Sequence, residues 1–272
     1  MKVVQFLDSD RDIDVEAASV ATWSVRKNGS LPTDTQYILY TVNERHFNNP
    51  IVNAVFDVIA RPPYDEEWLN SIDWEGRFNY KPPKDDYNKE YRVRGKFWGK
   101  FLSFLNTPCD NSFVMHIDWD IICRASLLGS LPPHGKAWSA YCVRELCTNG
   151  FMVKSQKFDD LGIGDVMKEP LSDPELYERM HKIIPSADEI GTTWYRQQYG
   201  DDTLHKLRRV YCGNVAGYIN NDIPLSDNND RILHYVLKTK PWQGFVSKDN
   251  PYVKLWWDVH DDMLRSIGEK NG

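Results

Sequence analysis

Two acids close a short apolar run in the middle of the chain. Residues 113–117 read Phe-Val-Met-His-Ile, and Asp118 and Asp120 follow directly. A short apolar run of this kind is typical of a strand. Side chains at positions i and i+2 share a strand face, so at the carboxyl end of the strand both carboxylates can leave the sheet together and bind a divalent metal. The run therefore predicts a strand whose end carries two oxygen ligands.

A second cluster lies far downstream, where residues 232–242 read Ile-Leu-His-Tyr-Val-Leu-Lys-Thr-Lys-Pro-Trp. His234 offers a neutral nitrogen ligand, which Mn²⁺ accepts beside oxygen ligands. Lys240 precedes a proline, so its backbone is biased toward an extended conformation that can direct the ammonium into a cleft. The alternatives are a histidine packed in the core and an ordinary surface lysine. We expect His234 to bind a metal together with Asp118 and Asp120, and Lys240 to contact a diphosphate.

Strand-like and helical patterns alternate through the N-terminal third, which predicts an α/β unit. Strand patterns occupy residues 3–7 and 36–42, a helical pattern occupies residues 15–27, and another apolar run occupies residues 52–60. Ligands bind such units beyond the carboxyl ends of their strands. If the sheet is parallel, Asp8, Ser9 and Asp10 share a crevice with the two acids that follow residue 117.

The segment between these patterns and the acids has two parts. Residues 62–94 read as a long loop, either functional or a surface insertion, and no chemistry is assigned to it. Residues 94–105 predict an amphipathic helix, with Lys96 and Lys100 on one face because they are four positions apart.

Composition narrows the class of protein. The chain has 272 residues, of which 41% are hydrophobic, enough for a substantial core. Its formal net charge of -6 disfavours a general nucleic-acid surface. The five cysteines indicate neither a disulfide framework nor a zinc site, and residues 1–10 do not resemble a signal peptide. No apolar run has the length of a membrane span. We therefore expect a soluble cytoplasmic protein.

Several common enzyme classes lack their motifs in this chain. There is no Gly-x-Gly-x-x-Gly after a strand, no Walker sequence, no His-Glu-x-x-His and no Gly-x-Ser-x-Gly. Dinucleotide oxidoreductases, P-loop kinases, zincins and α/β-hydrolases are therefore disfavoured. A bound phosphate would need another counter-charge, and a divalent ion held by the two aspartates supplies one.

The two clusters resemble the motifs of glycosyltransferase family eight, enzymes of the GT-A fold that include glycogenin and bacterial lipopolysaccharide galactosyltransferases. Asp118-Trp119-Asp120 is similar to the family's Asp-x-Asp, and residues 234–242 are similar to its His-x-x-Gly-x-x-Lys-Pro-Trp, with Leu237 in place of glycine. Looser similarities involve Lys100-Phe101-Leu102, residues 148–153, Asp188-Glu189 and residues 255–258.

The resemblance implies a fold and an activity. The fold would be a single α/β domain over residues 1–272, a Rossmann-like mixed sheet flanked by helices, with the nucleotide-binding part at about residues 1–125 and the acceptor part at about 126–272. The enzyme would use Mn²⁺ or Mg²⁺ and a uridine diphosphate sugar, and would retain the anomeric configuration. The acceptor could be a glycan, a protein or a lipid, with a nucleic acid disfavoured.

The resemblance also implies roles for residues. Lys100 would contact the donor, and Asp8, Ser9 and Asp10 would contact its nucleoside. The sugar becomes cation-like as its bond to the diphosphate breaks, so it needs a nearby carboxylate. Asp188, or else Glu189, is the candidate. We expect Trp242, Trp256 and Trp257 to serve in packing rather than in sugar binding.

Three other functions remain as alternatives. A sugar nucleotidyltransferase would normally have a basic, glycine-rich loop after the first strand, whereas residues 7–12 are acidic. A non-catalytic carbohydrate-binding protein would use the acids for a structural metal and would ignore a nucleotide. A metal-dependent phosphoesterase would usually gather more histidines and acids for two ions.

Overall fold

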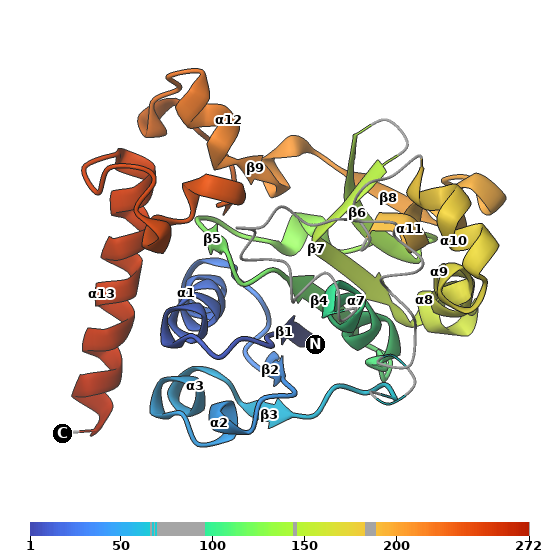
Figure 1. The fold of residues 1–272 in the computed structure, drawn as a ribbon, viewed down its shortest axis with the longest axis horizontal. Helices are drawn as coiled ribbons and strands as arrows, with labels where there is room; N and C mark the ends of the chain where they lie inside the picture. The colour runs from blue at the N-terminus through green and yellow to red at the C-terminus, as the bar shows by residue number, and fades with distance from the viewer. Residues whose placement is uncertain (66, 68, 70–95, 144–145, 183–188, 272) are drawn as a thin grey trace.

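A mixed sheet of seven strands forms the centre of the molecule in the computed structural model, which describes residues 1–65, 67, 69, 96–143, 146–182 and 189–271 (Figure 1). The strand order is β3-β2-β1-β4-β7-β6-β8. Strands β1 to β4 run parallel, and β7 reverses the direction beside β4. The strands are β1 (Lys2–Phe6), β2 (Gln36–Tyr40), β3 (Val58–Ala60), β4 (Phe113–Ile117), β6 (Trp138–Val143), β7 (Leu146–Ser155) and β8 (Leu204–Leu207).

Helices cover both faces of this sheet (Figure 1). One face is covered by α1 (Asp12–Asn28) and α3 (Pro50–Val55), and the long C-terminal α13 (Pro251–Asn271) packs against the outside of these two helices. The other is covered by α7 (Lys96–Asn106), α8 (Gln156–Asp160), α9 (Ile163–Ser172), α10 (Pro174–His181) and α11 (Ile190–Tyr199). Two further short helices are α2 (Glu44–Phe47) and α12 (Val215–Asn220).

Alternating side chains of the central strands build two separate cores. Val3 of β1 and Met115 of β4 belong to the core beneath α1 and α13. Their neighbours Val4 and Val114 belong to the core beneath α7 and α9. Successive strand residues point to opposite faces, and both faces are covered by helices, so most residues of β1 and β4 are apolar on both faces. This explains why the strand of residues 113–117 reads as a continuous apolar run.

A second, three-stranded sheet lies next to the carboxyl end of β4. Its order is β5-β10-β9, where β5 is Ile121–Cys123, β10 is Ile232–His234 and β9 is Gly213–Asn214. The strand β10 is antiparallel to β5 and parallel to β9. Short 3-10 turns connect the remaining segments, at Leu128–Ser130 (η1), Arg209–Tyr211 (η3), Leu225–Asp227 (η4), Leu237–Thr239 (η5) and Pro241–Gln243 (η6). This small sheet brings the C-terminal cluster to the aspartates.

The expected strands and helix of the N-terminal third are confirmed. The apolar run at residues 52–60 contains the end of α3 and then β3. Asn49 caps α3, because its side chain accepts hydrogen bonds from the amides of Ile51 and Val52, and Pro50 occupies the first turn. The Asn49-Pro50 pair is the sequence signal for this helix. Most of the long loop at 62–94 lies outside the described residues.

The cysteines depart from expectation at one hairpin. Cys142 is disulfide-bonded, and its Cα partner across the β6–β7 pairing is Cys147. The sequence indicated no disulfide framework, and Cys142 departs from that expectation, since cysteine spacing does not show which positions the fold brings together. Cys109, Cys123 and Cys212 are free thiols. Among the described helices, none combines the length and the apolar character needed to cross a membrane.

His46 of α2 connects the loop that follows β1 with the end of β2. His46 lies 2.9 Å from the carbonyl oxygen of Ser9 through Nε2 and 2.7 Å from Thr41 Oγ1 through Nδ1. A neutral imidazole satisfies both contacts, with Nε2–H donating to the carbonyl and Nδ1 accepting from the hydroxyl. Burial lowers the pKa of His46 below its usual value, although the Ser9 carbonyl and nearby acids oppose this.

We expect His46 to make folding sensitive to mild acid. Because its pKa is lower in the folded chain than in the unfolded chain, its contribution to stability is complete above the unfolded value of 6.5 and is lost as the pH falls through that value toward the folded pKa. The free energy of unfolding in urea, measured between about pH 7.5 and about pH 5.5, should fall less for His46→Gln than for the wild type. Equal slopes would contradict this role.

Candidate metal and diphosphate site

The two aspartates leave the sheet at the end of β4, and three main-chain contacts hold their turn. The amide of Asp118 donates to the carbonyl of Gly150 on β7 at 2.9 Å, and the carbonyl of Asp118 accepts from the buried side chain of Gln5 at 3.3 Å. The carbonyl of Asp120 accepts from the amide of Tyr235 at 2.8 Å. The positions of both carboxylates therefore depend on β1, β7 and the segment after β10.

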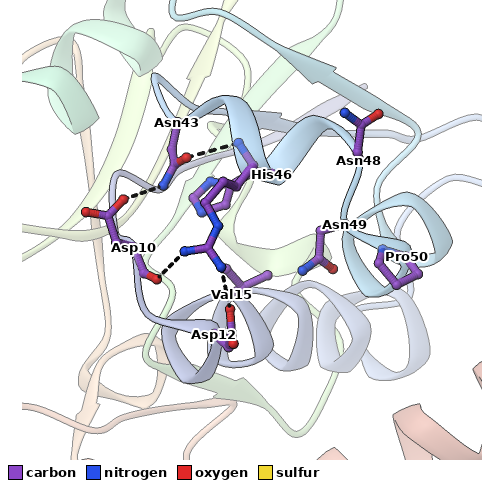
Figure 2. Close-up of a pocket in the computed structure, with 9 residues that line it drawn as sticks. Asp10, Asp12, Val15, Asn43, His46, Asn48, Asn49 and Pro50 are labelled. Carbon is purple, nitrogen blue, oxygen red and sulfur yellow. Dashed lines mark hydrogen bonds and ion pairs between the residues drawn. The ribbon is translucent and has the colours of Figure 1, made fainter.

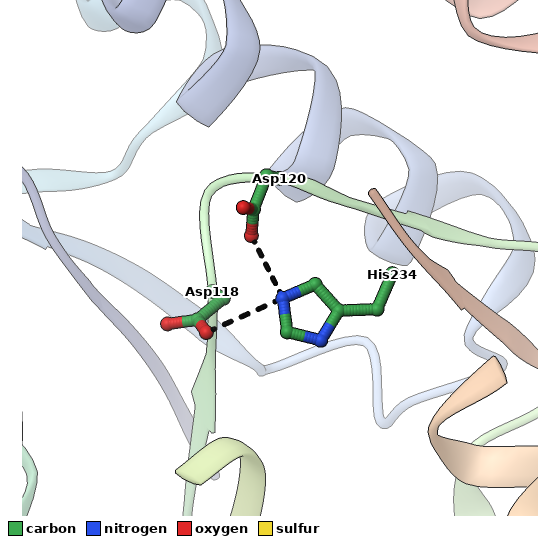
Figure 3. Close-up of side chains that lie close together, drawn as sticks. All are labelled: Asp118, Asp120 and His234. Carbon is green, nitrogen blue, oxygen red and sulfur yellow. Dashed lines mark hydrogen bonds and ion pairs between the residues drawn. The ribbon is translucent and has the colours of Figure 1, made fainter. Parts of the chain in front are cut away.

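His234 reaches the aspartates because β10 pairs with β5. In this pairing His234 is opposite Ile121, the residue that follows Asp120. Its Nε2 atom lies 3.0 Å from Asp120 Oδ1 and 3.6 Å from Asp118 Oδ2 (Figure 3). Among the described residues, these three side chains form a group whose ligand atoms lie within 4.8 Å of one another. Two carboxylates and one imidazole are a ligand set that suits Mn²⁺, and also Mg²⁺ with additional water ligands.

Two lysines contact the group, one at each aspartate. Lys100 of α7 places Nζ 3.0 Å from Asp118 Oδ1, and Lys240 places Nζ 3.0 Å from Asp120 Oδ2. Lys240 lies between η5 and η6 with φ -60° and ψ 121°, the extended conformation expected before a proline. Asp120 thus presents one oxygen to His234 and the other to Lys240, whereas both oxygens of Asp118 lie within 3.4 Å of the Lys100 ammonium. The structure brings together all five of these sequence-predicted residues.

The acids and bases of the site shift one another's pKa values in the direction that favours their charged forms. Burial alone would raise the pKa of both aspartates, but Lys100, His116 and His234 reverse the shift at Asp118, and Lys240 and His234 reverse it at Asp120. Both carboxylates are therefore ionised at neutral pH. For His234, burial would lower the pKa, yet Asp120 and the neighbouring Cys212 raise it well above its usual value. The ionised acids suit a cation, and the two ammonium groups suit an anion beside it.

Gly150 leaves the space in which these ligands lie. A Cβ atom at this position would be 2.8 Å from His234 Cε1 and 3.2 Å from Asp118 Oδ2. No side chain fits there without displacing a ligand, since carbon atoms in real structures do not approach so closely. The absence of a side chain at residue 150 supports the assignment of Asp118, Asp120 and His234 as a set of ligands.

Two site residues were missed by reasoning from sequence. His116 is buried and its Nε2 lies 3.4 Å from Asp118 Oδ1. Its position two residues before Asp118 on the same strand is a signal that could have identified it. Trp119 lies between the aspartates, and the ammonium of Lys240 is 4.1 Å from the centroid of its ring. That contact is not visible in the sequence.

The loop of Asp8, Ser9 and Asp10 lies at the same edge of the sheet as Asp118, because β1 and β4 are parallel neighbours. Its polar side chains have other partners, however. The Ser9 hydroxyl donates to Asp14 at 2.6 Å, and Asp10 accepts from the Asn43 side chain at 2.8 Å. A nucleoside contact by this loop stays a prediction.

A cavity of about 230 Å³ lies beside Asp10 (Figure 2). Arg45 lines it and pairs with Asp12 at 3.6 Å, and Asn43, Asn48 and Asn49 contribute to its wall. None of its lining residues belongs to the group around Asp118. The cavity is therefore separate in composition from the site of the aspartates.

The catalytic candidates are only partly placed. Asp188 lies outside the described residues. Glu189 precedes α11, where its carbonyl accepts a hydrogen bond from the Thr192 hydroxyl at 3.0 Å. The side chains of Leu237 and of residues 148 and 149 are likewise outside the described part of the chain. Trp242 and Trp256 pack together with ring centroids 5.0 Å apart, as expected for a packing role.

Solved structures with the same fold are glycosyltransferases. Glycosyltransferase GlyE of Streptococcus pneumoniae TIGR4 matches with a TM-score of 0.58 and 15% identity, over 100% of this chain and 64% of the GlyE chain. Galactosyltransferase LgtC, solved with donor and acceptor sugar analogs, matches with a TM-score of 0.61 and 14% identity, over 96% of both chains. Mouse xyloside xylosyltransferase 1 matches with a TM-score of 0.54 and 10% identity, over 86% of this chain and 97% of that one.

These matches confirm the predicted GT-A fold, a mixed sheet with helices on both faces. The chain spans slightly less than two thirds of the GlyE chain. No family model matches the sequence, and no curated protein matches it. At identities of 10% to 15%, the likeness concerns the fold, and the chemistry must be argued from the site itself.

We expect Gly150→Ala to weaken the binding of Mn²⁺ by roughly tenfold or more, because the added methyl group displaces His234 or Asp118. Titration of free Mn²⁺, followed by its electron paramagnetic resonance signal, measures this directly. Gly217→Ala is the matched control, since a Cβ at residue 217 of α12 meets no atom within 4 Å. Unchanged Mn²⁺ affinity in a folded Gly150→Ala variant would contradict the assigned ligand set.

Proposed function

We propose that this chain is a metal-dependent glycosyltransferase whose donor is a nucleoside diphosphate sugar, with uridine as the nucleoside. The observation that carries the proposal is the ligand set of Asp118, Asp120 and His234 with a lysine at each aspartate, at the carboxyl end of a central strand in a GT-A fold. Ligands bind at this edge of open α/β sheets. LgtC, which has a similar fold, was solved in complex with donor and acceptor sugar analogs, and this supports the transfer of a sugar by a chain of this fold.

The lysines are suited to stabilise the leaving group. Cleavage of the bond between the sugar and the diphosphate leaves negative charge on the diphosphate. A divalent ion held by the three ligands would neutralise part of that charge as a Lewis acid. The ammonium groups of Lys100 and Lys240 are fixed beside the carboxylates and can contact phosphate oxygens without reorganising. Such preorganised charges stabilise the transition state more than the ground state.

The sugar side of the reaction requires a carboxylate. Retention of the anomeric configuration means that the acceptor enters on the face from which the diphosphate departs. The sugar is cation-like while its bond to the diphosphate breaks, and a nearby carboxylate stabilises it. We assign this role to Asp188, with Glu189 as the alternative. The acceptor hydroxyl, on a glycan, a protein or a lipid, gives its proton to the departing diphosphate, so charge and atoms balance.

The donor half of the proposal is tested by calorimetry. We expect uridine diphosphate to bind in the presence of Mn²⁺, and chelation of the metal to abolish binding. Asp120→Asn should weaken metal-dependent binding by at least about a hundredfold, because it removes one ligand of the bridging ion. Asp34→Asn, which changes an exposed acid in the turn before β2, should bind like the wild type.

Two results would contradict this proposal. Binding that is indifferent to metal and to Asp120→Asn would separate the carboxylates from the diphosphate. No binding at all, by a protein that instead binds free sugars, would favour a carbohydrate-binding protein with a structural metal.

The catalytic assignment is tested by turnover. Once a donor sugar has been found by screening for release of uridine diphosphate, Asp188→Asn should lower kcat on the order of a hundredfold while the affinity for uridine diphosphate stays unchanged. Glu189→Gln is the matched comparison, and the larger loss of the two identifies the carboxylate. The anomeric configuration of the product, read by proton magnetic resonance, reports retention. Full activity in both variants would exclude both residues from this role.

A further inference from the structure

The side chain between the two aspartates is in contact with the lysine that we assign to the diphosphate. The Nζ atom of Lys240 lies 4.1 Å from the centroid of the Trp119 ring, well within the range of a cation–π interaction. The Lys240 side chain is only 15% exposed. Because the ammonium is largely desolvated there, its attraction to the ring is stronger than at an exposed site.

The Trp119 ring is itself held by the segment that carries Lys240. Trp242, two residues after Lys240, packs against Trp119 with ring centroids 5.6 Å apart and an interplanar angle of 36°. Trp242 packs in turn on Trp256 of α13, which is completely buried. The turn at residues 240–242 therefore contacts Trp119 through both a cation and an aromatic ring, and the aromatic contact fixes the ring that the cation uses.

Lys240 is thus restrained from two directions. Asp120 Oδ2 lies 3.0 Å from its ammonium, while Oδ1 of the same carboxylate faces His234. A lysine side chain has four rotatable bonds, so a single ion pair leaves it several arrangements, and the ring removes some of them. If only one arrangement of the lysine can bind the diphosphate, the apparent affinity is the intrinsic affinity multiplied by the fraction of molecules in that arrangement.

We propose that Trp119 is a positioning residue, which holds the ammonium of Lys240 over its ring face and thereby presents it to the diphosphate of the donor. The inference rests on the proposed function above and extends it to a residue that ligates nothing. The chemistry required at this position is an electron-rich ring face, rather than apolar bulk alone.

Fluorinated tryptophans at residue 119 test this requirement. Each added fluorine withdraws electron density from the ring face while leaving the shape of the side chain nearly unchanged. In the full chain with Mn²⁺, the affinity for uridine diphosphate measured by calorimetry should fall stepwise with the number of fluorines, to a loss of roughly tenfold with the most fluorinated ring. On a Lys240→Met background the dependence on fluorine should vanish, because the cation is gone.

A matched tryptophan supplies the control. Trp257 of α13 has the ammonium of Lys248 at 5.1 Å from its ring centroid, and the same fluorination there should leave the affinity unchanged. A wild type that binds uridine diphosphate with Mn²⁺ but shows no fluorine dependence at residue 119 overturns the positioning role alone. A dependence that persists without Lys240, or that appears equally at Trp257, overturns it as well. A wild type that binds no uridine diphosphate overturns the proposed function, and the positioning role with it.

Discussion

Two ionised carboxylates lie almost fully buried at the centre of this molecule, and much of its architecture balances their charge. Asp118 and Asp120 are 8% and 6% exposed. Burying a charge without a partner is costly, whereas a charge with cationic and hydrogen-bonding partners is tolerated. The partners come from α7, from β4 itself, from β10 and from the turn before η6. The same arrangement concentrates both signs of charge within a few ångströms, which is the requirement for holding a metal and a diphosphate together.

The fold and the core of the site could be predicted because their signals are local. The strand of residues 113–117 is apolar except at His116 because both of its faces are covered, and Asp118 stands out as the first residue past its end. Lys240 was identifiable from its place before Pro241, which fixes the backbone that aims the side chain. The wide separation of the two clusters in the sequence did not prevent their identification, since each cluster has its own local pattern.

Other features depend on which segments become neighbours in the folded chain, and a local sequence pattern does not predict this. The contact of Trp119 with Lys240 joins two turns through tertiary packing. The disulfide at Cys142 depends on the alignment of a hairpin. The polar partners of Ser9 and Asp10 arise from the docking of α1 and α2 on the end of β1. The helix that ends within residues 52–60 does have a local signal, because Asn49 and Pro50 mark the start of α3.

The pairing of β10 with β5 has a consequence for the order in which the site is assembled. Asp120 and His234 are separated by 114 positions, yet they meet through only three register pairs of a short strand. Contacts between such distant positions form slowly, because a long loop must close before the contact stabilises the chain. A ribosome-bound chain that ends before residue 232 already contains the strands flanking Asp118 but cannot offer the imidazole. His234 is therefore the last of these three side chains to be synthesised, so the group cannot come together before β10 has emerged from the ribosome.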